Sequence, residues 1–212
     1  MATHDDTTLL FPIGHCVGSY YGLSGPTDHF HQVRVGPDVV RLSDEQFAMW
    51  GLAHGAPDRP AGQPWNRQRL LETARKLGVS TAEEVLDGLV ADHLVVETTP
   101  GTDDAVDFAR RHRMVPLMLG LGNSAEEPRL YGVGLAGQPI LQMTSAVYDL
   151  YEWAHMDPDL WTACHGAADT ARQVEIDDPT STDPLRLLDA LLATLHTLLG
   201  PNAVYLDTRL AS

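Results

Sequence analysis

The stretch VRVGPDVVRLSDEQFAMW, residues 33–50, decides the fold because its pattern occurs twice in the chain. Residues 137–159, GQPILQMTSAVYDLYEWAHMDPD, follow residues 36–58, GPDVVRLSDEQFAMWGLAHGAPD, at a constant offset of 101 positions. A second block agrees, since the apolar pattern of residues 85–91 recurs in residues 187–193 at an offset of 102 positions. Two blocks at nearly one offset indicate a tandem duplication of a unit of roughly 100 residues.

The first copy of this stretch predicts a β-hairpin that leads into a helix. The side chains of residues 29–35 would alternate between two faces of a strand, with His31, Val33 and Val35 on one face, as expected of a half-buried strand. Gly-Pro-Asp at 36–38 forms a turn, and residues 39–42 return as the second strand. Ser43, followed by Gln46, has the spacing of a capping box, so a helix begins there.

The remaining patterns complete an α+β unit. In the first copy we expect a first strand at 9–13, a glycine-rich loop at 18–28, a helix from 43 to 54, helices at 66–77 and 80–93, and a closing strand at 94–98. In the second copy we expect a first strand at 115–121, a hairpin at 130–135 and 140–143, helices at 144–155, 160–173 and 185–199, a loop at 175–184, and a closing strand at 203–206. This order predicts a tandem duplication of a winged-helix domain, with domain 1 at 1–100, a linker helix at 101–113 and domain 2 at 114–212.

The string GPDVVRLSDEQFAMWGLAHG, followed by a helix and then STAEEVLDGLVADHLVVE, resembles the PqqD-like domains, the recognition elements that bind leader peptides for enzymes modifying ribosomal peptides. The resemblance covers residues 30–97 and, more weakly, 130–207, and residues 57–65 are an insertion relative to that family. It implies that a peptide adds as a strand to the edge formed by Val39, Val40, Arg41 and Leu42. The peptide would lie in a groove against the third helix, lined by Val85, Leu86, Leu89 and Val90.

The composition indicates a globular protein with an acidic surface. Of its 212 residues 43% are hydrophobic, and 29 acidic against 14 basic residues give a formal net charge of −15. That charge repels phosphate backbones and anionic lipids and favours a basic partner. No apolar run reaches the ~20 residues of a membrane span, and the first residues lack the features of a signal peptide, so we expect a cytoplasmic protein and no membrane partner. Lys76 is the only lysine, which indicates a GC-rich genome, and we expect a bacterial source.

Binding of nucleic acid is the usual role of a winged helix, and the charges of this chain argue against it. The expected recognition helix, TAEEVLDGLVADH at 81–93, carries four carboxylates and neither arginine nor lysine. Because binding to DNA depends on neutralising phosphates, this helix is poorly suited to a groove. A local basic patch is the alternative nucleic-acid site, formed by Arg67, Arg69, Arg75, Lys76, Arg110, Arg111 and Arg113.

The sequence contains no arrangement typical of an enzyme. Each cysteine has a neighbouring histidine, but adjacent residues on a strand point to opposite faces, which is poor geometry for a nucleophile and its base. His29 and His31 share a strand face, and His15 or Cys16 as a third ligand would complete a metal site. The simpler interpretation is a pair of partly buried polar side chains. We therefore expect no cofactor, no metal and, in the absence of a CxxC motif, no disulfide.

Two features of the helices carry further hypotheses. The aromatic residues of the second copy occur at helical spacing and pack in a core, or alternatively Trp153, Trp161 and Tyr205 line a small-molecule pocket. His54 and His155 occupy matched helix ends, where an imidazolium is favoured by the helix dipole and donates to the last carbonyl groups.

These patterns predict a non-enzymatic tandem winged-helix protein that binds a peptide or protein. The resemblance implies that it is an accessory recognition factor for ribosomal peptide modification. The alternatives are a winged-helix DNA-binding transcriptional regulator and an acidic antagonist that mimics a nucleic acid.

Overall fold

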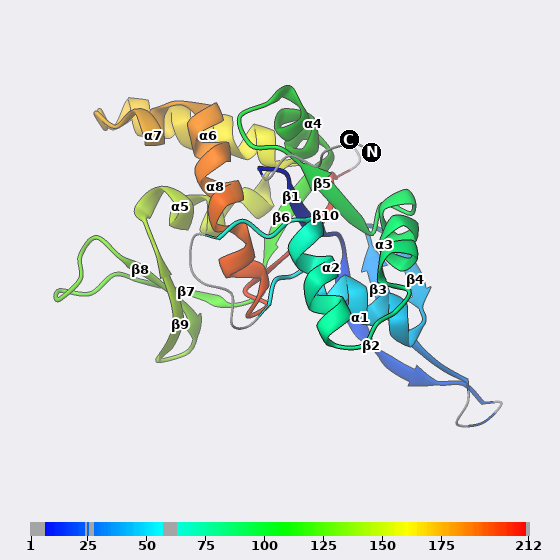
Figure 1. The fold of residues 1–212 in the computed structure, drawn as a ribbon. Coiled ribbons are helices and arrows are strands. Elements are labelled where there is room, and N and C mark those ends of the chain that lie inside the picture. The colour runs from blue at the N-terminus through cyan, green and yellow to red at the C-terminus, as the bar shows by residue number, and fades with distance from the viewer. Residues whose placement is uncertain (1–6, 24, 26–27, 57–62, 211–212) are drawn as a thin grey trace. The chain divides into compact units, whose positions relative to one another are not determined.

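A computed structural model describes residues 7–23, 25, 28–56 and 63–210 of the chain. Contacts divide the chain into two units, the first formed by Met1–Thr98 with Leu206–Thr208 and the second by Thr99–Tyr205 with Arg209–Ser212. Each unit combines helices with small antiparallel sheets (Figure 1), so the predicted α+β class is confirmed. Most of the insertion expected at 57–65 lies outside the described residues.

The first unit contains a two-stranded sheet, β1-β5, and a three-stranded sheet in the order β2-β3-β4. Its elements are β1 (Leu9–Pro12), β2 (His15–Tyr21), β3 (His29–Val35), β4 (Asp38–Leu42), α1 (Asp44–Leu52), α2 (Arg67–Lys76), α3 (Ala82–Ala91) and β5 (Val95–Thr98). Figure 1 shows α1 next to the β2-β3-β4 sheet, in agreement with its contacts to β3 and β4. These elements match the hairpin, the three helices and the closing strand that the sequence predicts.

The β3–β4 hairpin leads into α1 through the predicted cap. Val35 pairs with Asp38 across a two-residue turn, in which Gly36 adopts a φ of 56° that favours glycine. The Ser43 hydroxyl accepts from the Gln46 N–H at 3.3 Å, and the Gln46 side chain accepts from the Ser43 N–H at 3.0 Å. This reciprocal capping box satisfies two backbone donors at the start of α1 and ends β4 at Leu42.

The core of the first unit joins the inner face of the β2-β3-β4 sheet to all three helices. Val33 from β3, Met49 from α1 and Leu70 from α2 are each fully buried in it. Trp50 is also buried, and its indole N–H donates to the Ile13 carbonyl at 3.1 Å. Because this donor is satisfied, the large ring can lie in the core without an unpaired polar group.

The glycine-rich segment after β1 differs from its prediction. Residues 18–28 were expected to form a loop, but β2 extends through Tyr21 and pairs with β3 from His29 onward. Gly18, with a φ of 144°, lies where the register shifts between β2 and β3, so the glycine marks a bulge in a strand.

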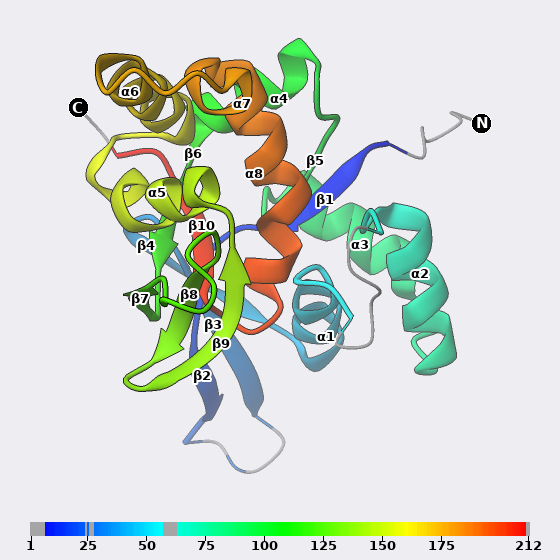
Figure 2. The same ribbon diagram turned by 90° about the vertical axis from the view of Figure 1, so that its left-hand side faces the viewer.

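The second unit begins with a helix, α4 (Asp103–Arg111), whereas the described elements of the first unit begin with β1. Its further elements are β6 (His112–Pro116), β7 (Leu119–Gly122), β8 (Tyr131–Leu135), β9 (Gln138–Met143), α5 (Ser145–Trp153), the 3₁₀ turn η1 (Ala154–Met156), α6 (Leu160–Gln173), α7 (Pro179–Thr182) and α8 (Pro184–Leu199). The last strand, β10 (Val204–Thr208), is divided, because Leu206–Thr208 belong to the first unit. β7, β8 and β9 form a three-stranded sheet, and β6 pairs with β10. Figure 2 shows α5, α6 and α8 close together, as their mutual contacts require.

Two predictions for the second unit were wrong in detail. The single strand expected at 115–121 is two strands, β6 and β7, because β6 ends at Pro116, which has no N–H to continue a ladder. The loop expected at 175–184 contains the one-turn helix α7, whose first residue is Pro179 and whose N-cap is Asp178. Proline is well suited to that position, since its missing N–H would have no partner inside the helix.

A pair of glycine substitutions tests the packing of the first unit. An alanine Cβ at Gly14, where φ is 101°, would lie 2.6 Å from the Val33 side chain and 2.7 Å from the Arg34 carbonyl oxygen. We expect Gly14→Ala to lower the free energy of unfolding by more than about 1 kcal/mol. Gly88→Ala in α3, where no atom lies within 4 Å of the added Cβ, should raise it by about 0.5–1 kcal/mol. Urea unfolding followed by circular dichroism measures the free energy of unfolding of both variants. Equal changes in this free energy would contradict the packing described at the two glycines.

Candidate functional site

The strand β4 lies at the edge of the β2-β3-β4 sheet, and among the described residues its outer side pairs with no strand. Because Val35 and Asp38 flank a two-residue turn, they form a hydrogen-bonded pair. Hydrogen-bonded and non-hydrogen-bonded pairs alternate in an antiparallel ladder, so the N–H and C=O groups of Val39 and Arg41 point away from β3. The edge therefore offers two residues of main chain to an added strand.

The outer face of this sheet carries a stripe of rings and positive charge. The Arg41 guanidinium lies over the Phe30 ring at 4.3 Å, and Tyr20 stacks on the other side of Phe30 at a centroid distance of 5.9 Å. Val39 is 52% exposed on the same face. This stripe borders the outward main-chain groups of β4 and extends across all three strands.

Part of the surface that was predicted to line a groove beside α3 is covered by the core of the first unit. Leu42, Leu86 and Leu89 are at most 2% exposed and belong to the core, so a partner cannot contact them without opening the unit. Their assignment as binding residues is corrected on this ground. Of the eight predicted residues, those with accessible surface are Val39, Val40, Arg41, Val85 and Val90.

The charges around α3 are dominated by carboxylates. Glu83, Glu84, Asp87 and Asp92 are all exposed on this helix. Arg67 on α2 donates to Asp87 at 2.5 Å and to both oxygens of Glu97 at 3.0 and 3.1 Å, and these acidic partners, Glu97 above all, raise the pKa of Arg67. Arg75 lies 3.8 Å from Glu83. Part of the predicted basic patch is thus neutralised within the first unit.

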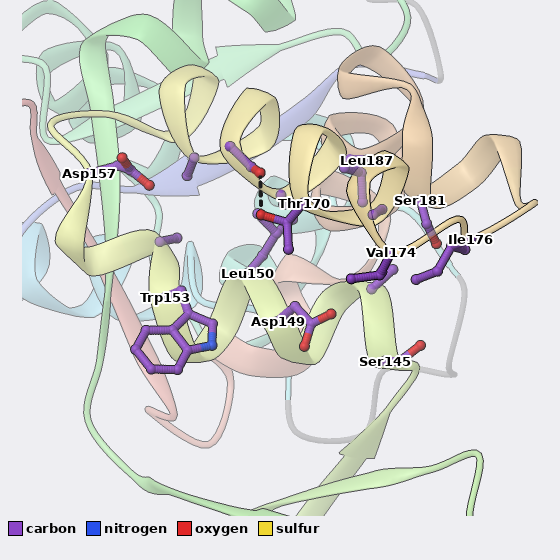
Figure 3. A pocket seen from close by; sticks show the side chains of 16 residues that line it. Ser145, Asp149, Leu150, Trp153, Asp157, Thr170, Val174, Ile176, Ser181 and Leu187 are labelled. Atoms are coloured by element: carbon purple, nitrogen blue, oxygen red, sulfur yellow. Dashed lines mark hydrogen bonds between the residues drawn. The ribbon is translucent and has the colours of Figure 1, made fainter.

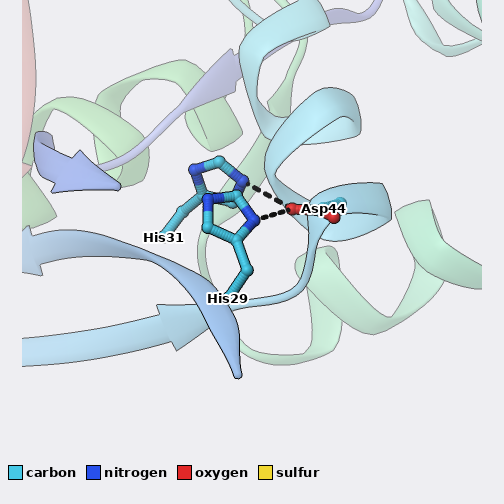
Figure 4. Close-up of side chains that lie close together, drawn as sticks. All are labelled: His29, His31 and Asp44. Atoms are coloured by element: carbon cyan, nitrogen blue, oxygen red, sulfur yellow. Dashed lines mark hydrogen bonds and ion pairs between the residues drawn. The ribbon is translucent and has the colours of Figure 1, made fainter. Parts of the chain in front are cut away.

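A second feature of the first unit is a cluster of two histidines and one carboxylate (Figure 4). Asp44 Oδ1 lies 2.8 Å from His29 Nδ1 and 2.9 Å from His31 Nε2. The hydrogen bond from His31, followed by that from His29, lowers the pKa of the Asp44 carboxyl. Three potential ligand atoms lie within 4.8 Å of one another in this cluster, and we refer to His29, His31 and Asp44 as the histidine–aspartate cluster.

The sequence analysis anticipated part of this cluster. It placed His29 and His31 on one strand face, which the structure confirms, but named His15 or Cys16 as the third ligand, which is wrong. His15 on β2 pairs with Arg34 on β3, so its side chain lies on the face of the sheet opposite to His31. The hairpin register predicts the position of Asp44. His31 pairs with Leu42, so Asp44, two residues after Leu42, comes opposite His29, two residues before His31.

The second unit contains a cavity of about 420 Å³ between α5, α6 and α8 (Figure 3). Apolar side chains dominate its wall, and Asp149 is one of two carboxylates that line it. Removal of solvent by these walls raises the pKa of Asp149. Trp153 lines the cavity as the pocket hypothesis required, whereas Trp161 and Tyr205 are not among its lining residues.

The two histidines at matched helix ends differ from their prediction. The His54 ring is hydrogen-bonded to the Trp50 carbonyl at 3.1 Å, as a helix-end histidine should be. Burial lowers the pKa of His54, however, so the charged form proposed for it is disfavoured. His155 Nδ1 is buried with no hydrogen-bond partner in the described part of the chain. The capping role is thus correct for one copy and wrong for the other.

Comparison of the chain with protein-family models, curated proteins and solved structures gave no match. Among the helices in the described ranges, none has the length and apolar character needed to cross a membrane. The function must therefore be argued from the geometry of the edge strand, the histidine–aspartate cluster and the cavity.

The two cysteines are free thiols, and we predict that Cys164 is inert while the protein is folded. Burial raises the pKa of this thiol from 9.0 to about 12, so little thiolate forms at mildly alkaline pH. Iodoacetamide followed by mass spectrometry should label Cys164 only in concentrated urea. Since the unfolded thiol ionises near 9.0 and the folded thiol only near 12, the free energy of unfolding should also decrease as pH rises above 9. Rapid labelling of Cys164 in the native protein would contradict its burial.

Proposed function

We propose that the chain is a tandem duplication of a winged-helix domain and that its first copy binds a peptide or protein by strand addition. The duplication is supported by the order of elements, since a strand, a three-stranded sheet, helices and a closing strand occur in each unit. The sequence offset of 101 positions aligns Ser43, the N-cap of α1, with Thr144, the N-cap of α5. Such agreement between sequence offset and structure is expected of a repeat.

The observation that carries the binding function is the edge strand β4. It presents the outward main-chain groups of Val39 and Arg41 beside an exposed apolar side chain, which is the combination that strand addition uses. The equivalent strand β9 contains Pro139, which has no N–H, and proline is a common means of protecting a sheet edge. The first unit is therefore the better platform of the two.

The chemistry of the surroundings favours a partner with basic residues. Carboxylates are exposed on α3, and the net charge of −15 attracts cations over a longer range. The aromatic stripe formed by Tyr20, Phe30 and Arg41 offers a surface for apolar or aromatic side chains. A non-enzymatic cytoplasmic recognition factor for ribosomal peptides, as the PqqD-like resemblance implies, fits this arrangement.

The alternative of DNA binding is less well supported. In the proposed winged-helix domain α3 would be the recognition helix, and its exposed carboxylates would face phosphates at a cost in free energy. Arg67 and Arg75, the basic residues nearest to it, are already in ion pairs with Asp87, Glu97 and Glu83. An acidic surface of this kind is compatible with the remaining alternative, a protein that mimics a nucleic acid.

Strand addition predicts a specific effect of proline at position 41. Random peptides displayed on phage are selected against the whole chain, and the dissociation constant of the best peptide is measured. We expect Arg41→Pro to weaken binding about tenfold, because it removes one outward donor. Arg41→Ala, which keeps the N–H, should have a smaller effect. In an added strand only every second peptide N–H points toward β4. Methylation of these nitrogens should abolish binding, whereas methylation of the nitrogens between them should not.

The second unit provides the matched control, Gln142→Pro, at the equivalent position of β9. This variant should bind the selected peptide as the wild type does, and circular dichroism should show that both proline variants are folded. Failure to select any peptide, or loss of binding in Gln142→Pro alone, would overturn the proposal for β4. Salt-dependent binding of duplex DNA by wild type would favour the transcriptional regulator.

Small-molecule binding is a second candidate function, favoured by the cavity of about 420 Å³ in the second unit. This volume lies in the range typical of ligand sites, and a carboxylate in a mostly apolar wall suits an apolar amine. Leu150, Val174 and Leu187 would contact the apolar part of such a ligand, and Asp149 its charge.

The role of Asp149 is tested by thermal unfolding with a panel of apolar amines. A bound amine should raise the melting temperature of the wild type and of the control Asp169→Asn, whose side chain is exposed on α6 and not among the cavity-lining residues. Asp149→Asn should lose the shift because it removes the charge and keeps the shape. Equal shifts in both variants would show that the amines bind elsewhere.

A further inference from the structure

We propose that the histidine–aspartate cluster is a Zn²⁺ site with three protein ligands. His29 Nδ1, His31 Nε2 and Asp44 Oδ1 converge on one point between β3 and the start of α1 (Figure 4). Two imidazole nitrogens and one carboxylate oxygen form a donor set that zinc commonly takes in proteins, with water in the fourth position. The assignment is independent of the proposed strand addition.

The distances from Asp44 Oδ1 to the two imidazole nitrogens are close to those that a metal requires. Zn–N bonds of about 2.0–2.1 Å in a tetrahedron place neighbouring ligand atoms about 3.3 Å apart. The two nitrogen–oxygen distances are 2.8 and 2.9 Å, so an ion needs a separation only about half an ångström larger. The Asp44 side chain is 72% exposed and can make this movement by rotating. The three ligand atoms lie within 4.8 Å of one another, so binding also requires the His29 ring to move toward His31.

His31 is held in a fixed orientation by its surroundings. Its ring stacks on Phe47 with a centroid distance of 4.0 Å and an interplanar angle of 7°. Its second nitrogen, Nδ1, lies 2.7 Å from the Ser19 hydroxyl on β2. A hydrogen bond on the nitrogen opposite the metal is the usual support of a ligating histidine, because it fixes the tautomer and the ring direction.

The Ser19 hydroxyl suits both the free and the bound state of the cluster. Without metal, His31 Nε2–H donates to Asp44 and the Ser19 O–H donates to Nδ1. With metal, the lone pair of Nε2 faces the ion and Nδ1–H donates to the Ser19 oxygen. A hydroxyl is both donor and acceptor, so one residue satisfies His31 in each state.

Comparison with the second unit separates the ring contact of His31, which packing explains, from its polar partners, which packing does not explain. Tyr131 faces Met143 as His31 faces Leu42. Its ring contacts that of Tyr148 at a centroid distance of 4.9 Å, tilted by 35°, whereas His31 and Phe47 are nearly parallel. A ring-on-ring contact is thus common to both units. The residue of the second unit that corresponds to Asp44 is Ser145, the first residue of α5, so the carboxylate and the imidazole both occur only in the first unit at these positions.

The accessible side of the cluster leaves room for a solvent ligand. The side chains of His29 and His31 are 24% and 11% exposed, so the ligand atoms lie at the surface with buried support behind them. An ion held there would replace the two hydrogen bonds to Asp44 with metal–ligand bonds that link β3 to α1. Since unfolding separates the ligands, binding should stabilise the first unit.

The site is tested on the full, untagged chain by titration with Zn²⁺ in calorimetry and with Co²⁺ in absorption spectroscopy. We expect one ion per chain, a tetrahedral Co²⁺ spectrum and a higher melting temperature with Zn²⁺. Asp44→Asn and His29→Gln should abolish these signals while leaving the fold intact, since both side chains lie at the surface. Ser19→Ala, which removes only the support of His31, should weaken binding by about tenfold.

His93→Gln is the matched control, because His93 is exposed and not part of the cluster. It should bind Zn²⁺ as the wild type does. The proposal is overturned if wild type does not bind Zn²⁺, or if binding survives in Asp44→Asn and His29→Gln. The cluster is then a hydrogen-bonded link between β3 and α1 only.

Discussion

The start of α1 is the point on which the first unit depends. The capping box between Ser43 and Gln46 turns an extended strand into a helix within one residue. Leu42 therefore remains in the sheet with its side chain in the core, and Met49 enters the same core from the helix. Asp44, the first helical residue, is placed against His29 and His31. One local interaction thus fixes the end of the edge strand, the direction of the helix and the position of the only carboxylate in the cluster.

Elements governed by local chemistry were predictable from the sequence. The β3–β4 hairpin and the capped helix follow from alternation, from the turn at Gly36 and from Ser43. β2 was missed because glycine indicates a loop or a bulge equally well, and only pairing with β3 decides between them. The separation of β6 from β7 was missed for a similar reason, since an apolar run does not reveal where its pairing partner changes.

The candidate sites were less predictable because they depend on register and on covering surfaces. The helical period of α3 identifies its apolar side, but it cannot tell that Leu86 and Leu89 are covered by the unit's own core while Val85 and Val90 are only half buried. Asp44 was overlooked because its approach to His29 follows from a hairpin register and not from spacing along the chain. The cavity at Asp149 depends on how three helices meet, for which the sequence holds no direct signal.

The differences between the two units indicate a division of roles. Where β4 offers an open edge, β9 carries Pro139. Where the first unit stacks His31 on Phe47, the second has a tilted contact between Tyr131 and Tyr148. Both units have a ring contact at this position, and in the first unit the His31 imidazole is also hydrogen-bonded to Ser19 and Asp44. Conversely, the cavity beside Trp153 lies wholly within the second unit. Under the proposed duplication, the shared framework would maintain the fold and the unshared polar groups would bind different ligands.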